Sequence, residues 1–154
     1  MKKINWHLLI ISILVPNIIG LVIGLLTSSN TNYNNFISPS FAPPGWVFPV
    51  AWTILYTLMG ISYYLIFTSH NPNKNKALNI YKIQLAVNYF WSILFFNLNL
   101  KLLSFLWVIL LIILVIIMII KFYNINKNAA YIQMPYLLWL IFAAVLNLSI
   151  YILN

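Results

Sequence analysis

Long apolar segments separated by short polar stretches are the main pattern along the chain. Leu, Ile, Val and aromatic residues dominate five segments: Trp6 to Leu26, Trp46 to Phe67, Ile80 to Leu98, Leu102 to Ile120 and Ala129 to Leu153. A helix of about 20 apolar residues crosses the hydrocarbon core of a bilayer. The pattern therefore predicts an all-α membrane protein, a five-transmembrane-helix bundle that residues 1–154 form as a single domain.

The composition agrees with this prediction and removes most classes of enzyme. The chain is 64% hydrophobic and 5% charged, whereas soluble domains carry about 25% charged residues. It contains no Asp, Glu or Cys, so general-base and glycosidase carboxylates, hard-metal sites, thiolates and disulfides are excluded. We therefore expect no catalytic residue of these kinds and no metal site.

The lysines predict how the bundle is oriented. The net charge is +8, but the lysines lie scattered between the apolar segments and form no patch. Nucleic acid is therefore not an expected partner. In an alternating five-span bundle, one end carries only Lys101 and the other carries Lys2, Lys3, Lys74, Lys76, Lys82, Lys121 and Lys127. The positive-inside rule then predicts a multi-pass protein of the cell (cytoplasmic) membrane, with the N-terminus cytoplasmic and the C-terminus outside.

Three predicted helices carry aromatic and amide side chains on one face. The positions recur every three or four residues: Pro49, Trp52, Tyr56, Met59 and Tyr63; Gln84, Asn88, Trp91 and Phe95; Tyr136, Trp139, Ala143 and Asn147. Lipid cannot satisfy amides, so these faces should turn inward. They suit an aromatic cavity for a flat ligand, but also simple helix packing by hydrogen bonds. Periodicity alone leaves both interpretations open.

Other features leave further alternatives. The connection from Thr27 to Gly45 has the length of a lid or binding loop, and also the composition of a disordered connector. The spacing of Gly20 and Gly24 permits close helix approach, either within one chain or between chains. His7 and His70 have no carboxylate partner, so an interfacial role is favoured over a haem or metal ligand. The Leu102 to Ile120 helix has no polar face and should meet lipid broadly.

The second apolar segment and the loop before it resemble a known family. The stretch from Pro39 to Tyr63 includes Ala-Pro-Pro-Gly-Trp and then Trp-Thr-Ile-Leu-Tyr-Thr-Leu-Met-Gly. This is similar to the signature of the TspO/MBR family, also called translocator proteins, tryptophan-rich sensory proteins or peripheral-type benzodiazepine receptors. Segments 84–96 and 135–147 resemble that family's third and fifth helices, so the resemblance covers nearly the whole chain in order.

The resemblance implies a five-helix bundle, usually a homodimer in the lipid bilayer, with a cavity beneath a lid formed by the first loop. Its implied ligands are protoporphyrin IX, haem and other hydrophobic small molecules, and no cofactor is required. Lys101 is the only outer cation available to porphyrin propionates, Asn88 would hydrogen-bond the ligand, and Ala143 would leave room for it. Carried onto this chain, the ligand-binding residues are Tyr33, Pro43, Trp52, Tyr56, Asn88, Phe95, Phe96, Trp139 and Ala143.

The function that the resemblance implies is a membrane receptor or sensor that binds porphyrins and transports or sequesters them. One alternative is a light- and oxygen-dependent protoporphyrin-degrading enzyme, in which Trp139 would act. Asn32 stands where family members commonly have a tryptophan implicated in that reaction, which argues against it. A second alternative is a membrane interaction or regulatory protein without ligand transport. Phe41 also replaces a common tryptophan, and no basic residue follows Tyr151, so the animal cholesterol motif is absent.

Overall fold

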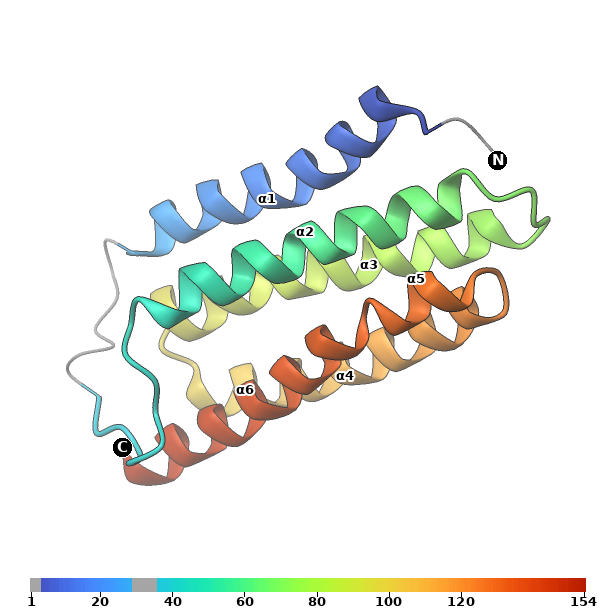
Figure 1. The fold of residues 1–154 in the computed structure, drawn as a ribbon. Helices are drawn as coiled ribbons and strands as arrows, with labels where there is room; N and C mark the ends of the chain where they lie inside the picture. The colour runs from blue at the N-terminus through green and yellow to red at the C-terminus, as the bar shows by residue number, and fades with distance from the viewer. Residues whose placement is uncertain (1–3, 29–35) are drawn as a thin grey trace.

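The computed structural model describes residues 4–28 and 36–154, and every regular element in these ranges is helical. The elements are α1 (Trp6–Ser28), α2 (Val47–Phe67), α3 (Lys74–Ser92), the π-helical segment η2 (Ile93–Asn97), α4 (Lys101–Tyr123), α5 (Lys127–Tyr131) and α6 (Met134–Leu153). Figure 1 shows the long helices lying side by side in alternating directions. The α2–α3 and α4–α5 turns lie at the N-terminal end of the bundle, and the C-terminus lies at the other end.

Within residues 4–28 and 36–154, four helices are long and apolar enough to cross a membrane. These are Trp6–Thr27 (mean hydropathy 2.7), Val47–Phe67 (1.6), Lys101–Tyr123 (3.4) and Lys127–Leu153 (2.2). The predicted span from Ile80 to Leu98 is not among them, because its helix α3 already starts at Lys74 and combines three lysines with three asparagines and Gln84. The prediction of an all-helical membrane protein is confirmed, whereas the predicted number of five spans is not confirmed by length and composition alone.

The last predicted span is interrupted. Helix α5 ends at Tyr131 and α6 begins at Met134, so the apolar run from Ala129 to Leu153 forms two elements. Pro135 stands at the start of α6 and has no N–H to donate to the carbonyl of Tyr131, four residues earlier. Gln133, fully buried in this turn, donates from Nε2 to Ser62 Oγ at 2.7 Å. This hydrogen bond therefore holds the turn against α2, an interaction that hydropathy alone does not predict.

Helix α4 packs along one face and leaves the other exposed. It contacts α3, α5 and α6, and its buried positions recur every three or four residues: Ser104, Val108, Leu111, Val115, Met118 and Phe122. The helix therefore has one inward face, which composition did not indicate, and its other positions are exposed, as expected for a helix that meets lipid broadly. The most exposed span is α1, of which 11% is buried, against 28% for α4.

Helix α1 is held to the bundle by close backbone approach and a few hydrogen bonds. A Cβ at Gly60 of α2 would overlap the backbone of Ser12 and Ile13 of α1. Pro16 lies inside α1, and its carbonyl accepts from Tyr89 Oη at 2.7 Å. Gly20 lies against the ring of Tyr56, whereas Gly24 has no described atom within 4 Å of an added Cβ. Only the first glycine of the pair therefore packs within the chain.

We predict that Gly60→Ala loosens α1 from α2. The added methyl group has no room against the α1 backbone, and overpacking of this kind costs about 1–3 kcal/mol. The thermal unfolding midpoint in detergent micelles should therefore fall. Gly24→Ala is the matched control, because it brings the same gain in helix propensity and meets no described atom within 4 Å. Equal midpoints for the two variants would contradict the prediction.

Candidate functional site

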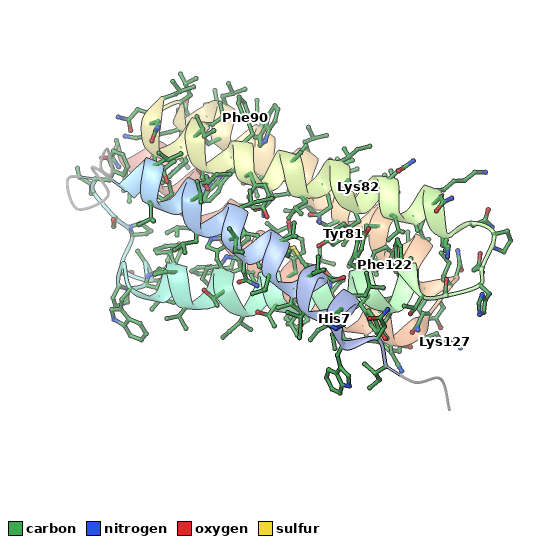
Figure 2. The ribbon with its side chains drawn as sticks, turned by 90° about the horizontal axis from the view of Figure 1, so that it is seen from above. His7, Tyr81, Lys82, Phe90, Phe122 and Lys127 are labelled. Carbon is green, nitrogen blue, oxygen red and sulfur yellow. The ribbon has the colours of Figure 1, made fainter. Side chains whose placement is uncertain are left out.

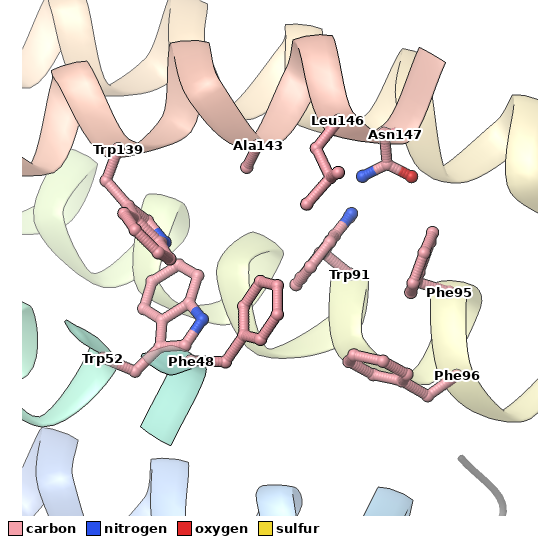
Figure 3. A pocket seen from close by; sticks show the side chains of 9 residues that line it. All are labelled: Phe48, Trp52, Trp91, Phe95, Phe96, Trp139, Ala143, Leu146 and Asn147. Carbon is pink, nitrogen blue, oxygen red and sulfur yellow. The ribbon is translucent and has the colours of Figure 1, made fainter. Parts of the chain in front are cut away.

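An aromatic cavity lies between α2, the α3–η2 segment and α6, toward the C-terminal end of the bundle. Its walls are formed by Phe48, Trp52, Trp91, Phe95, Phe96, Trp139, Ala143, Leu146 and Asn147. Figure 3 shows these side chains facing one another across the space between the helices. The enclosed volume is about 20 Å³, which holds about one water molecule.

Trp52 connects the three helices that form the cavity. Its ring centroid is 6.4 Å from Trp91 on α3 and 6.5 Å from Trp139 on α6. It also stacks on Tyr56, one turn further along α2, at 5.4 Å. The predicted aromatic stripes of the three helices therefore meet around one indole ring. Pro49 of the α2 stripe is exposed, and Phe48 faces the cavity in its place.

The π-helical segment η2 forms the end of one cavity wall. Phe95 and Phe96 are consecutive, yet both line the cavity, with their rings edge to face at 4.9 Å. A π-turn holds more residues than an α-turn, and such turns are frequent at functional sites. The wider turn and the T-shaped ring pair present two neighbouring rings to the same space. Phe95 continues the wall by stacking on Trp91 at 5.5 Å.

Two buried polar atoms in the cavity wall have no hydrogen-bond partner among the described residues. They are Nε1 of Trp91, a donor, and Oδ1 of Asn147, an acceptor. The two residues are only 7% and 2% exposed. Figure 3 shows the indole nitrogen of Trp91 turned toward Asn147. Buried polar groups are nearly always paired, so this corner of the cavity suits a water molecule or the polar edge of a ligand.

Below the cavity, a row of hydrogen bonds joins α2, α3 and α6. Tyr56 Oη donates to Asn88 Oδ1 at 2.8 Å, and Asn88 Nδ2 donates to Tyr136 Oη at 2.9 Å. Tyr136 Oη in turn donates to Gln84 Oε1 at 2.8 Å. Both ends of the Asn88 amide are therefore occupied by tyrosines, and Asn88 does not line the cavity.

The structure brings together part of the predicted ligand-binding set. The members that line the cavity are Trp52, Phe95, Phe96, Trp139 and Ala143. Tyr56 and Asn88 belong to the hydrogen-bonded row below it, Pro43 is half-buried and not part of the wall, and Tyr33 lies outside the described residues. The set omitted Phe48, Trp91, Leu146 and Asn147. Helical spacing had already placed Trp91 and Asn147 on the inward stripes.

The segment from 36 to 46 passes over the C-terminal end of the bundle. Asn154 clasps it, because its Oδ1 accepts from Ile37 N and its Nδ2 donates to Ile37 O, both at 2.9 Å. The ring of Phe36 lies 6.1 Å from Phe95 and 4.3 Å from Lys101 Nζ. Lys101, the predicted outer cation, therefore lies next to a ring that contacts the cavity wall.

The histidines lie away from this site. Figure 2 shows His7 at the start of α1, and both His7 and His70 are exposed. Among residues 4–28 and 36–154, no group of three His, Cys, Asp or Glu side chains comes together to hold a metal ion.

We predict that Asn88→Leu lowers stability and that Asn147→Leu does not. Asn88→Leu leaves the hydroxyl of Tyr56 without its acceptor and removes the amide that donates to Tyr136 Oη, which costs about 1–3 kcal/mol. Asn147→Leu removes an amide oxygen that has no described partner, so stability should stay equal or rise. Denaturation in micelles, followed by tryptophan fluorescence, measures both. A larger loss of stability for Asn147→Leu than for Asn88→Leu would contradict this assignment of roles.

Comparison with known proteins agrees with this architecture. Residues 12–153 match the model of the TspO/MBR family. The chain is 38% identical over 148 residues to the tryptophan-rich protein TspO of Archaeoglobus fulgidus, covering 95% of this chain and 96% of that protein. It is 32% identical over 133 residues to protein CrtK of Rhodobacter capsulatus (85% and 83% covered), and 30% identical over 122 residues to the human translocator protein (77% and 72% covered). This chain belongs to the TspO/MBR family.

Proposed function

We propose that this protein is an integral membrane receptor or sensor that binds porphyrins, such as protoporphyrin IX or haem, and related flat hydrophobic ligands. The observation that carries the proposal is the pair of unsatisfied polar atoms, Trp91 Nε1 and Asn147 Oδ1, in a wall otherwise made of aromatic rings. Rings favour stacking on a flat apolar ligand, and the free donor and acceptor match a polar group at its edge.

Ligand binding requires the cavity to open. Its 20 Å³ compares with about 300–1,000 Å³ for sites that enclose a small molecule. The side of the cavity near the 36–46 segment is where opening costs least, because two hydrogen bonds from Asn154 and a few ring contacts hold that segment. The hydrogen-bonded row of Tyr56, Asn88 and Tyr136 keeps the other side closed.

We also propose that the α3–η2 segment is a fifth span and that the cell membrane holds the chain with the cavity end outside. The helix is continuous from Lys74 to Asn97, and its lysines are confined to its first half. The turns that carry Lys74 and Lys127 lie at the N-terminal end of the bundle, while Lys101 begins α4 at the cavity end. This asymmetry favours a cytoplasmic N-terminus and an outer C-terminus. A homodimer is the assembly that the family resemblance supports.

The relatives' names bear on the kind of activity. One relative is called a tryptophan-rich sensory protein and others translocator proteins, which supports sensing or carriage of the ligand. Light-dependent degradation of protoporphyrin is the second candidate, since Trp139 lies in the cavity wall within 6.5 Å of Trp52. If the protein degrades protoporphyrin, the porphyrin absorbance should bleach faster under a lamp when the protein is present. The Trp139→Phe variant should bleach it more slowly than the wild type.

We predict that protoporphyrin IX quenches tryptophan fluorescence saturably when it is titrated in the dark into the protein in nanodiscs. Ala143→Phe fills the cavity and should weaken the apparent affinity at least about tenfold, which corresponds to roughly 1.4 kcal/mol. Val145→Phe is the control, since it adds the same ring two residues away on the exposed face of α6. Linear, unsaturable quenching in all three proteins would mean simple partition into lipid, and would favour the regulatory-protein alternative.

The clasp at Asn154 gives a kinetic prediction. Asn154→Ala removes both hydrogen bonds to Ile37, so protoporphyrin IX should associate and dissociate several-fold faster in stopped-flow fluorescence, with little change in affinity. Ser38→Ala is the control, because it alters the same segment and leaves the clasp intact. Unchanged rates in Asn154→Ala would show that ligand entry does not depend on this segment.

A further inference from the structure

A second hollow lies at the other end of the bundle from the aromatic cavity. It is formed by the start of α3 and the end of α4, and is lined by Asn71, Asn73, Lys76, Lys121, Asn124 and Ile125. Its volume is about 270 Å³, so it is open enough to take a group much larger than water. All but one of its lining side chains are polar, and two of them carry a positive charge.

The two lysines of this hollow have no partner among the described residues. Lys74, next to it in sequence, donates to Phe67 O and Ser69 O, and Lys127 lies over the ring of Tyr123. No such contact exists for Lys76 or Lys121 within residues 4–28 and 36–154. The chain contains no Asp or Glu, so no carboxylate side chain of this protein can neutralise them. The hollow therefore carries two unpaired positive charges, which favour an anion there.

Neutral donors accompany the charges. Asn71 Oδ1 accepts from Asn73 N at 2.9 Å, so its Nδ2 group remains free to donate. Helix α3 begins at this hollow with no side-chain cap at Asn73. Lys74 N donates to Asn71 O, but the next N–H groups of the first turn have no cap, and the positive end of the helix dipole lies here. Ammonium, amide and backbone donors together match the several acceptor oxygens of a phosphate group.

We propose that this hollow, lined by Lys76, Lys121 and three asparagines, binds the phosphate group of an anionic phospholipid. The position favours a lipid over free phosphate, because the hollow lies at the end of α4, a membrane-crossing helix, where headgroups are found. Ile125 adds an apolar side chain next to the donors. Basic pockets between the cytoplasmic ends of membrane helices bind anionic headgroups in this way. The proposal is independent of any ligand in the aromatic cavity.

The test compares full-length protein in nanodiscs of phosphatidylcholine alone and in nanodiscs that also contain phosphatidylglycerol, at fixed ionic strength. Phosphatidylglycerol should raise the thermal unfolding midpoint of the wild type by roughly 2–4 °C. Lys76→Gln/Lys121→Gln should lose most of that gain. Lys82→Gln/Lys127→Gln is the matched control, with the same loss of charge outside the hollow, and should keep it. An equal gain in all three proteins would overturn the site and leave general surface attraction.

Two further experiments distinguish lipid binding from misfolding of the variant and from binding of free phosphate. Lys76→Arg/Lys121→Arg keeps the charge and should keep the gain, which shows that loss in the glutamine variant does not come from misfolding. Inorganic phosphate added to phosphatidylcholine nanodiscs should not reproduce the gain at millimolar concentration. If it does, and the glutamine variant abolishes that effect, the hollow binds a free anion and the lipid assignment is wrong.

Discussion

The row of hydrogen bonds from Tyr56 through Asn88 and Tyr136 to Gln84 is the interaction on which the site depends. In a bilayer, polar groups inside a span must be satisfied by the protein itself. Here three helices share that requirement, so α2, α3 and α6 are fixed in register at this level. The ring of Trp52 lies on Tyr56 and against Tyr136, so the row also forms the floor of the aromatic cavity and sets its depth.

Some buried polar groups of the bundle hold helices together, and two others line the aromatic cavity without a described partner. Ser62 Oγ donates to Ala129 O, and Gln133 Nε2 donates to the same hydroxyl, so short hydrogen bonds join α2 to α5 and to the turn after it. Trp91 and Asn147 occupy equally buried positions on the other side of the row, but their polar atoms face the cavity without a described partner. A protein selected only for stability gains nothing from burying them unpaired.

The sequence predicted the elements better than the roles of individual residues. Hydropathy located the apolar helices because lipid contact depends on composition, but it placed the start of the third helix at Ile80, whereas lysine-containing turns extend it back to Lys74. Helical spacing correctly predicted that Gln84, Asn88 and Trp91 face the interior of the bundle. It could not distinguish Asn88, whose amide is hydrogen-bonded to two tyrosines, from Asn147, whose Oδ1 has no described partner, because hydrogen-bond partners come from other helices. The exposure of Pro49 and the π-turn at Ile93 also depend on local backbone geometry that no periodicity reports.

The π-helical segment η2 also has a consequence for how the site changes over evolution. An α-helix advances about 100° per residue, so deleting one residue between Ile93 and Asn97 would restore an α-turn and rotate one flank of the helix against the other. Phe95 and Phe96 would no longer share the cavity wall, although no aromatic residue had been substituted. A single-residue gap here in a homologous gene therefore marks an altered pocket more clearly than several conservative replacements along the same wall.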